Sequence, residues 1–246
     1  MKEGYVRGLA ITAIVGSWLF TVDWLVAPLW QDHYSVIDQA VSEMGGNTAN
    51  LPWLLNAGIV AMGVALLACA AAVWMVLPRN GWRPLISAPL AVAGVAGVVS
   101  AFATMDCSTT VNRACFDRAV AGTASWHEYA HSWAYVVGGV ALTISSLAVA
   151  GALRRRRPLL AIAPAVGGGL GIALWVTEFT ADPKFDPHMH YGIYQRIGLL
   201  VSAGWVQLLA AAVLIRLEEK RRASSPAWAS AAPPTWSAAR PTRPSA

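Results

Sequence analysis

Six long apolar stretches set the strongest limit on the fold of this chain. They occupy residues 8–29, 52–77, 84–104, 126–151, 158–180 and 191–216. Each is long enough for a transmembrane helix, which needs roughly 20 mostly apolar residues to cross about 30 Å of hydrocarbon. Lipid admits only helices and closed barrels as spanning structures, and barrel strands are shorter and alternate in hydropathy. The pattern therefore predicts an all-α polytopic membrane bundle of six transmembrane helices.

The composition agrees with a membrane bundle and divides the chain into two parts. Charged residues make up 13% of the 246 residues, about half the share expected in a soluble domain, and the mean hydropathy is +0.49. The first stretch is too long for the apolar part of a signal peptide, so we expect it to remain as the first span. Residues 1–222 form the predicted transmembrane domain. Residues 223–246 are rich in Ala, Ser and Pro and are predicted to be a disordered cytoplasmic tail.

The basic residues predict the orientation of the bundle, because cytoplasmic connections of membrane proteins carry an excess of Lys and Arg. One set of alternate connections and ends is rich in them: Lys2, Arg7, Arg79, Arg83, Arg154, Arg155, Arg156, Arg157, Arg216, Lys220, Arg221 and Arg222. The other set holds only Arg113, Arg118, Lys184 and Arg196. Both termini are therefore predicted to be cytoplasmic. We assign the net charge of +5 to attraction by anionic lipid at that face and not to nucleic-acid binding.

Most acidic residues and histidines fall at the opposite, outer end of the predicted helices. Ten of the thirteen carboxylates lie on or near that side: Asp23, Asp32, Asp38, Glu43, Asp106, Asp117, Glu128, Glu178, Asp182 and Asp186. Four of the five histidines join them, and His131 lies one helical turn further in. A functional site is therefore expected to open to the outside. Its candidate catalytic acids and bases are Glu43, Asp106, His127 and His131.

The segment SWHEYAH at residues 125–131 has three interpretations. His127 and His131 are four residues apart and share a helix face, a spacing that helical metal sites use, and Asp106 would supply a third ligand. Zinc needs three or four such ligands, so it is the cofactor that this arrangement would hold, although no cofactor is firmly implied. The second interpretation is a metal-free acid–base role. In the third, His127 lies at the membrane interface and His131 belongs to a buried hydrogen-bond network.

Ionisable residues at membrane depth are expected to face the bundle and to pair, because an isolated charge there costs a few kcal/mol or more. Asp23, Glu178 and Arg196 are such residues. We expect Arg196 to pair with Asp23, Asp106 or Glu178. The pair would either clamp the outer ends of the helices together or leave a cationic site for the phosphate or carboxylate of a lipid-like ligand. In the second case Asp23, Glu178 and Arg196 are ligand-binding residues.

The three cysteines have different expected roles. Cys69 lies inside the second apolar stretch and is expected to be a small buried hydrophobe. Cys107 and Cys115 both fall in the second outer connection, which is an oxidising environment. They are predicted to form a disulfide directly after Asp106. The alternative for these two cysteines is a pair of metal thiolates, although their spacing matches no paired C-x-x-C site.

Short motifs at the outer end resemble a known family. They are Tyr34, VSEMG at 41–45, a helix with Asn56 and Gly58, Asp106 after the third span, His127 at the start of the fourth, and Gln195–Arg196 at the start of the last, followed by Trp205. This order resembles the prokaryotic integral-membrane family named domain of unknown function 998, over roughly residues 8–217. The sequence departs from the family pattern at Val41 and Met44, where Ile and Leu are usual. FATMD at 102–106 also lacks the proline of the family's Phe-Pro-x-Asp turn and has one residue more.

The resemblance implies a six-span, multi-pass protein of the bacterial plasma membrane. It also marks an outer cluster of shared polar residues, namely Glu43, Asp106, His127, Gln195 and Arg196, in which Gln195 and Arg196 would bind a ligand. It implies no activity.

Two classes of function remain open. The first is a membrane protein whose polar, outward-facing pocket handles a lipid-like or small amphipathic ligand, by binding or by catalysis, with membrane lipids as partners. The alternative is a non-enzymatic transporter, accessory or structural protein whose polar cluster only ties the helix ends together. No nucleophile motif such as G-x-S-x-G supports a specific reaction. The apolar inner halves of the spans argue against a polar path across the membrane.

Overall fold

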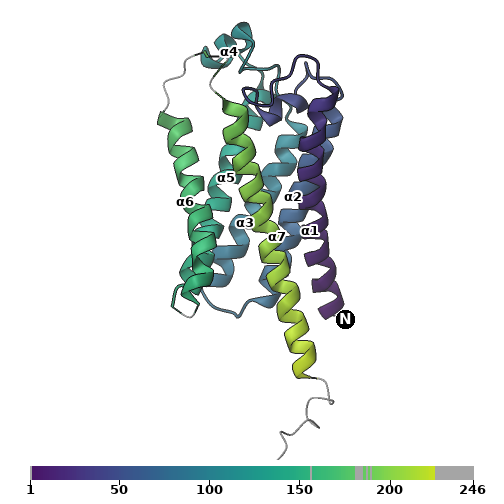
Figure 1. Ribbon diagram of the computed structural model, residues 1–246, viewed down its shortest axis with the longest axis vertical. Helices are drawn as coiled ribbons and strands as arrows, with labels where there is room; N and C mark the ends of the chain where they lie inside the picture. The colour runs from purple at the N-terminus through teal and green to yellow at the C-terminus, as the bar shows by residue number, and fades with distance from the viewer. Residues whose placement is uncertain (1, 156, 181–184, 187, 189, 225–246) are drawn as a thin grey trace, which may run out of the picture.

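A bundle of long, roughly parallel helices makes up most of the molecule (Figure 1). The computed structural model describes residues 2–155, 157–180, 185, 186, 188 and 190–224, without the side chains of residues 174–180. Within that part the helices are α1 (Lys2–Val26), α2 (Pro52–Val76), α3 (Trp82–Phe102), α4 (Arg113–Val120), α5 (Trp126–Leu153), α6 (Pro158–Thr180) and α7 (Tyr191–Ala223). Two short 3-10 helices, η1 (Ala27–Trp30) and η2 (Val41–Gly45), lie between α1 and α2.

Five of these helices are long and apolar enough to cross a membrane. They are α1 together with η1, α2, α3, α5 and α7. The sixth predicted stretch forms α6, whose searched apolar part runs over Pro158–Ala173 and is shorter than a span. The structure thus confirms an all-helical, multi-pass architecture with five candidate spans. A sixth crossing by α6 stays a prediction.

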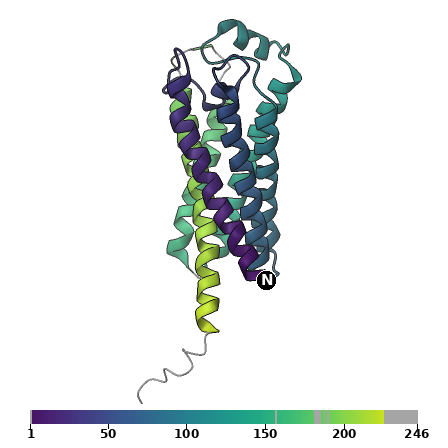
Figure 2. The ribbon, with the colours of Figure 1, turned by 90° about the vertical axis from the view of Figure 1, so that its right-hand side faces the viewer.

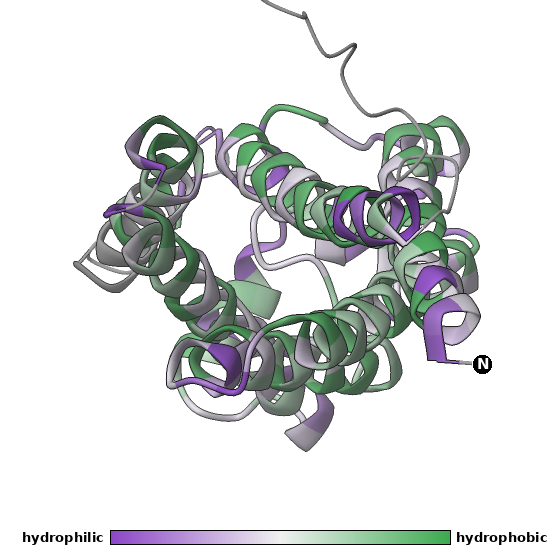
Figure 3. Ribbon diagram, turned by 90° about the horizontal axis from the view of Figure 1, so that it is seen from below, coloured by the Kyte–Doolittle hydropathy of each residue, from purple (hydrophilic) through white to green (hydrophobic). Residues whose placement is uncertain are grey.

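The outer surface of the bundle is apolar, as a lipid-facing surface must be. Large aliphatic side chains such as Leu19 and Ile215 are more than half exposed, and the helices seen from below are mostly hydrophobic along their length (Figure 3). Exposed tryptophans lie near both ends of the helices, among them Trp53 and Trp126 at one end and Trp74 at the other. Trp is enriched at the two interfaces of a membrane, so this distribution supports a transmembrane bundle.

Small residues bring the helices close together. A Cβ atom on Gly63 of α2 would lie 2.9 Å from the carbonyl oxygen of Gly94 in α3, and one on Gly171 of α6 would lie 2.4 Å from the Thr143 hydroxyl of α5. Such contacts are typical of membrane helices, which gain stability from close packing. The view in Figure 2 shows α1 crossing in front of α2 and α7, and α1 packs against both of them. The helix α6 packs mainly against α5.

The longer connections meet at one end of the bundle, which we call the upper end because α4 lies there in Figure 1. The short helix predicted to end near Gly45 is present as η2. A disulfide joins Cys107 to Cys115, as predicted, and Cys69 is free and fully buried, also as predicted. The N-terminus and the short basic connections lie at the opposite, lower end (Figure 1).

Candidate functional site

Glu43, a predicted acid or base, is held in a cage of hydrogen-bond donors that we call the Glu43 cluster. The residue is only 5% exposed. Oε1 accepts the backbone N–H of Thr110 at 2.9 Å, and Oε2 accepts the hydroxyls of Ser108 and Thr110, both at 2.7 Å. The amide of Gln39 donates to Oε2 at 3.4 Å. These donors satisfy a buried carboxylate that would otherwise be costly, so Glu43 ties η2 to the connection before α4.

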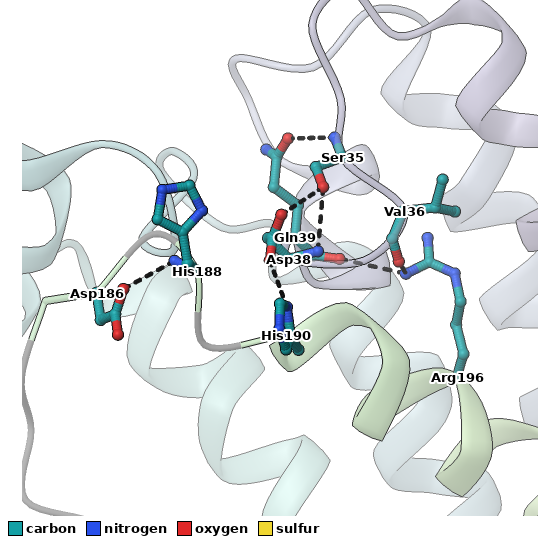
Figure 4. A network of polar contacts seen from close by, with 8 residues as sticks. All are labelled: Ser35, Val36, Asp38, Gln39, Asp186, His188, His190 and Arg196. Carbon is teal, nitrogen blue, oxygen red and sulfur yellow. Dashed lines mark hydrogen bonds and ion pairs between the residues drawn. The ribbon is translucent and has the colours of Figure 1, made fainter.

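Arg196 holds the first upper connection, between α1 and α2, against the start of α7. Its Nη1 donates to the backbone carbonyl oxygens of Val36 at 2.6 Å, Gly192 at 3.1 Å and Gln39 at 3.3 Å. Its Nη2 donates to the Tyr34 hydroxyl at 2.9 Å. Figure 4 shows the guanidinium reaching the turn that contains Val36. We call these residues the Arg196 clamp.

The predicted pairing of Arg196 with Asp23 or Asp106 is wrong, because its donors go to backbone carbonyls and a hydroxyl. The third predicted partner, Glu178, has its side chain outside the described residues. The reason for the difference is the close approach of α7 to the first connection. A Cβ atom on Gly192 would lie 2.4 Å from the carbonyl oxygen of Gln39, so only glycine lets the carbonyls come within reach of the arginine.

Tyr34 completes the clamp from the side of the connection. Its hydroxyl donates to the carbonyl oxygens of Gln39 and Ala40, which lie 3.1 and 2.9 Å away. Burial raises the pKa of Tyr34 to about 12, although the nearby Arg196 acts in the opposite direction. Tyr34 therefore remains a hydrogen-bond donor at neutral pH and is not a candidate base.

A second contact ties the same connection to the residue before α7. Asp38 Oδ1 lies 2.9 Å from His190 Nδ1, and Asp38 Oδ2 accepts the Ser35 hydroxyl at 2.7 Å (Figure 4). The hydrogen bond from the Ser35 hydroxyl lowers the pKa of Asp38 below its ordinary value, and the hydrogen bond with His190 adds a smaller effect in the same direction. The neighbouring His188 donates its backbone N–H to Asp186, a contact within its own loop. These groups therefore stabilise local structure.

Asp106 caps the start of α5. Ser125 is the N-cap residue, and its hydroxyl accepts the backbone N–H of Glu128. In a usual capping box the side chain of that glutamate would accept the N–H of the serine. Here Asp106 accepts both the N–H of Ser125, at 2.9 Å, and its hydroxyl, while the buried Glu128 accepts the N–H of Asp106 at 2.6 Å. The two carboxylates thus lock the third span to the fourth, in an arrangement that we call the Asp106 turn.

The two histidines of SWHEYAH have different surroundings. The ring of His127 stacks on Trp126, with ring centroids 3.8 Å apart. His131 is buried, and its Nδ1 lies 3.0 and 2.9 Å from the carbonyl oxygens of Ser100 and Ala103 in the segment that ends α3. No group of three or more His, Cys, Asp or Glu side chains suited to a metal ion occurs within the described ranges. His131 thus belongs to the buried hydrogen-bond network proposed in the third interpretation.

Asp23 lies in the last turn of α1, against the backbone of α2. A Cβ atom on Gly58 would lie 2.0 Å from its Oδ2, so the carboxyl group occupies the space that this glycine leaves. Asp23 Oδ2 is buried and has no hydrogen-bond partner in the described part of the chain. Gly58 explains how the side chain of Asp23 fits against α2. No contact in the described part of the chain satisfies its buried Oδ2 atom.

A cavity of about 150 Å³, which we call the inner cavity, lies below the polar clusters. It is lined by residues of α1, α2, α3, α5 and α7, and by Val41 and Ser42 of η2. Its lining is mostly apolar, with His131 and Gln195 among its few polar side chains. Gln195 is fixed there because its Oε1 accepts the backbone N–H of Val41.

A larger hollow of about 670 Å³, the lateral groove, lies between α5, α6 and α7. Lining side chains such as Leu159, Val166 and Leu208 are also exposed on the outside of the bundle, so the groove opens sideways. The groove and the inner cavity adjoin, since the same residues line both: Tyr135, Gly139, Leu142, Gln195, Leu199 and Ser202. The hollow space thus leads from the apolar flank of the bundle to His131.

Five of the sequence-predicted site residues therefore fall into two groups. Glu43, Asp106 and Arg196 are engaged in clusters at the upper end, and His131 and Gln195 line the cavity below. The predicted polar pocket that opens outward stays a prediction, because the two cavities lie between helices and are mainly apolar. Sequence reasoning missed the donors Ser108 and Thr110, which no motif marks. It also missed the S-x-x-E capping signature of Ser125 and Glu128, which was available.

Comparison with known families gives one match. The family model DUF998, described as a protein of unknown function, matches residues 14–212. Neither the curated proteins nor the solved structures gave a match to the chain.

Proposed function

Because the chain belongs to the DUF998 family, whose function is unknown, we propose its function from the arrangement of its cavities. We propose that it binds a lipid-like, amphipathic ligand that enters sideways from the membrane through the lateral groove. The polar end of the ligand would rest in the inner cavity against His131. Of the four side chains predicted as acids or bases, His131 is the one that lines either of these cavities, so it is also the candidate base of any reaction.

The observation that supports this proposal is the shared lining of the two cavities. A volume of about 670 Å³ is within the range of small-molecule binding sites, which are concave, mostly apolar and carry a few polar groups. The groove is flanked by exposed aliphatic side chains, so acyl chains of the surrounding lipid would lie beside its opening. A lipid could thus enter without leaving the hydrocarbon layer.

The topology that this function needs is part of the proposal. We propose six spans, with both termini in the cytoplasm of a bacterial cell and the upper end outside. The basic residues of the lower end support that orientation. The inner cavity would then lie in the outer half of the membrane, and its ligand would come from the outer leaflet.

A cavity-filling substitution tests the proposal. Gly139 lines both cavities, so Gly139→Leu should block the passage between them. Gly169→Leu on α6 is the matched control, because nothing lies within 4 Å of a Cβ atom at that position. Native mass spectrometry of purified protein should show co-purified lipid on the wild type and on Gly169→Leu, and little on Gly139→Leu. Equal lipid content in all three proteins would refute the proposal.

A structural role is the second candidate function, for the upper polar clusters only. Its supporting observation is that the described hydrogen bonds of Glu43, Asp106 and Arg196 are made within the protein, mostly with backbone and hydroxyl groups, and with the side chains of Gln39 and Glu128. Arg196→Ala should therefore lower the free energy of unfolding by about 2 kcal/mol or more, since hydrogen bonds from charged groups contribute about 1.5–3 kcal/mol.

The control for this substitution is Arg113→Ala, which removes an exposed ion pair with Asp117 and should cost under about 1 kcal/mol. Denaturant unfolding in detergent micelles compares the two. An Arg196→Ala protein that keeps wild-type stability but loses bound lipid would contradict the structural role and restore Arg196 as a ligand-binding residue.

A further inference from the structure

The hydrogen-bond state of His131 indicates which kind of ligand head fits the inner cavity. Its Nδ1 faces the carbonyl oxygens of Ser100 and Ala103, at 3.0 and 2.9 Å. The Ser100 hydroxyl, 3.1 Å from Nδ1, can donate or accept, whereas the two carbonyl oxygens only accept. Because two of the three groups around Nδ1 need a donor, we assign the hydrogen to Nδ1. In an uncharged imidazole the other nitrogen is then an acceptor. Nε2 makes no hydrogen bond to any residue in the described ranges, and His131 lines the cavity.

The cavities carry no charge to match a charged head. Among their described lining residues there is no Asp, Glu, Lys or Arg. The nearest candidate cation, Arg196, is engaged with the carbonyl oxygens of Val36 and Gly192 instead. A phosphate or carboxylate buried here would lack a counter-charge, which is unfavourable in an apolar environment. The remaining polar lining consists of neutral groups such as Ser42, Tyr135 and Gln195.

From these two observations we infer that the ligand is an uncharged lipid alcohol. Its hydroxyl group donates to His131 Nε2 in the inner cavity, and its aliphatic chain lies in the lateral groove. This inference rests on the proposed function and deepens it by naming the ligand class. It also replaces the anionic head that the sequence alone suggested for Arg196.

Three probes with the same 18-carbon chain test the inference: oleyl alcohol, methyl oleate and oleyl phosphate. The full chain in detergent micelles is titrated with each, using displacement of radiolabelled oleyl alcohol. Wild-type protein should bind the alcohol about ten-fold more tightly than methyl oleate, which has no hydroxyl to donate, because a buried acceptor left without a partner is unfavourable. Oleyl phosphate should bind at least as weakly as methyl oleate.

A substitution at His131 links this preference to the imidazole. In His131→Phe the ring shape is kept, but the acceptor toward the cavity is lost together with the donor to the carbonyls of α3. The ten-fold preference for the alcohol should then fall to nearly one. The wild-type selectivity needs no variant, so the inference remains testable even if His131→Phe does not fold.

The outcomes separate the two proposals. If no probe binds, or if Gly139→Leu binds all three as the wild type does, the proposed function itself fails. If binding is blocked by Gly139→Leu but methyl oleate or oleyl phosphate binds the wild type as tightly as the alcohol does, only the inference about the lipid alcohol fails. Equal loss of all three probes in His131→Phe would also overturn it.

Discussion

At the scale of single residues, Asp106 shows how one carboxylate can hold two spans together. It accepts two hydrogen bonds from Ser125 and donates its own backbone N–H to Glu128. The hydroxyl and the N–H of Ser125, together with the charges of Arg118 and His127, hold the pKa of Asp106 below its ordinary value. A carboxyl group with a lower pKa in the folded chain contributes stability that is fully present above its unfolded pKa. That contribution is lost as the pH falls toward the folded pKa.

The Asp106 turn therefore predicts a specific sensitivity to acid. The wild-type protein should lose stability below about pH 4, the ordinary pKa of aspartate, and Asp106→Asn should lose less over the same range because it has no proton to bind there. Thermal unfolding of both proteins at pH 7 and at pH 3 measures the difference. At pH 7 the variant should be the less stable of the two. Parallel losses of stability on acidification would show that Asp106 is not one of the groups responsible.

Some of these residue-scale contacts could be predicted from the sequence, and others could not. The disulfide followed from two cysteines in one outer connection, and a structural role for His131 was one of three interpretations of SWHEYAH. The partners of Arg196 are backbone carbonyls, and a residue pattern carries no signal for them because every residue has a carbonyl. The expectation of an ion pair therefore failed where α7 approaches the first connection at Gly192.

At the scale of elements, the disulfide and the Glu43 cluster form one unit. Ser108 and Thr110 lie between Cys107 and Cys115, and both donate to Glu43. The disulfide between Cys107 and Cys115 thus limits the conformations of the segment that supplies these donors. Replacing both cysteines by serine should lower the free energy of unfolding by about 2 kcal/mol, as expected for a short closed loop.

The same unit predicts an energetic coupling. Glu43→Gln should cost less stability in the background without the disulfide than in the wild type, because the donors are then no longer held in place. A double-mutant cycle should give a coupling energy of about 1 kcal/mol. Glu218→Gln serves as the control, since in the described part of the chain Glu218 forms ion pairs with Arg221 and Arg222 at the lower end of α7, and it should show no coupling. A coupling energy near zero between Glu43 and the disulfide would mean that η2 holds the connection before α4 without help from the disulfide.

The elements themselves were well predicted, whereas the space between them was not. Hydropathy alone placed the long helices, because length and apolar character determine a membrane helix. It missed the polar ends of two of them, since α1 begins at Lys2 instead of residue 8 and α7 continues to Ala223 instead of residue 216. The lateral groove depends on α6 packing against α5 and leaving room beside α7. The glycines of α6, such as Gly168 and Gly171, meet side chains of α5, but a run of glycines does not show which neighbour it faces.

At the scale of the whole molecule, the proposed orientation determines which leaflet supplies the ligand, and it rests on α6 crossing the membrane. The exposed residues Arg155 and His188 flank α6. If α6 crosses, cysteines introduced by Arg155→Cys and His188→Cys lie on opposite sides. A membrane-impermeant maleimide applied to intact cells should then label the second and not the first. Thr48→Cys, in the first upper connection, should be labelled like His188→Cys, and Asn80→Cys, in the α2–α3 connection, should be protected like Arg155→Cys.

The labelling pattern distinguishes the ways in which the topology could be wrong. The wild-type chain is the blank, because Cys69 is buried and the other two cysteines are joined. Labelling of Asn80→Cys and protection of Thr48→Cys would show that the bundle has the opposite orientation. The inner cavity would then lie in the inner half of the membrane. Equal labelling of Arg155→Cys and His188→Cys would mean that α6 does not cross. In that case α6 would cover the groove from one side of the membrane only, and entry of a lipid between α6 and α7 would no longer follow from the fold.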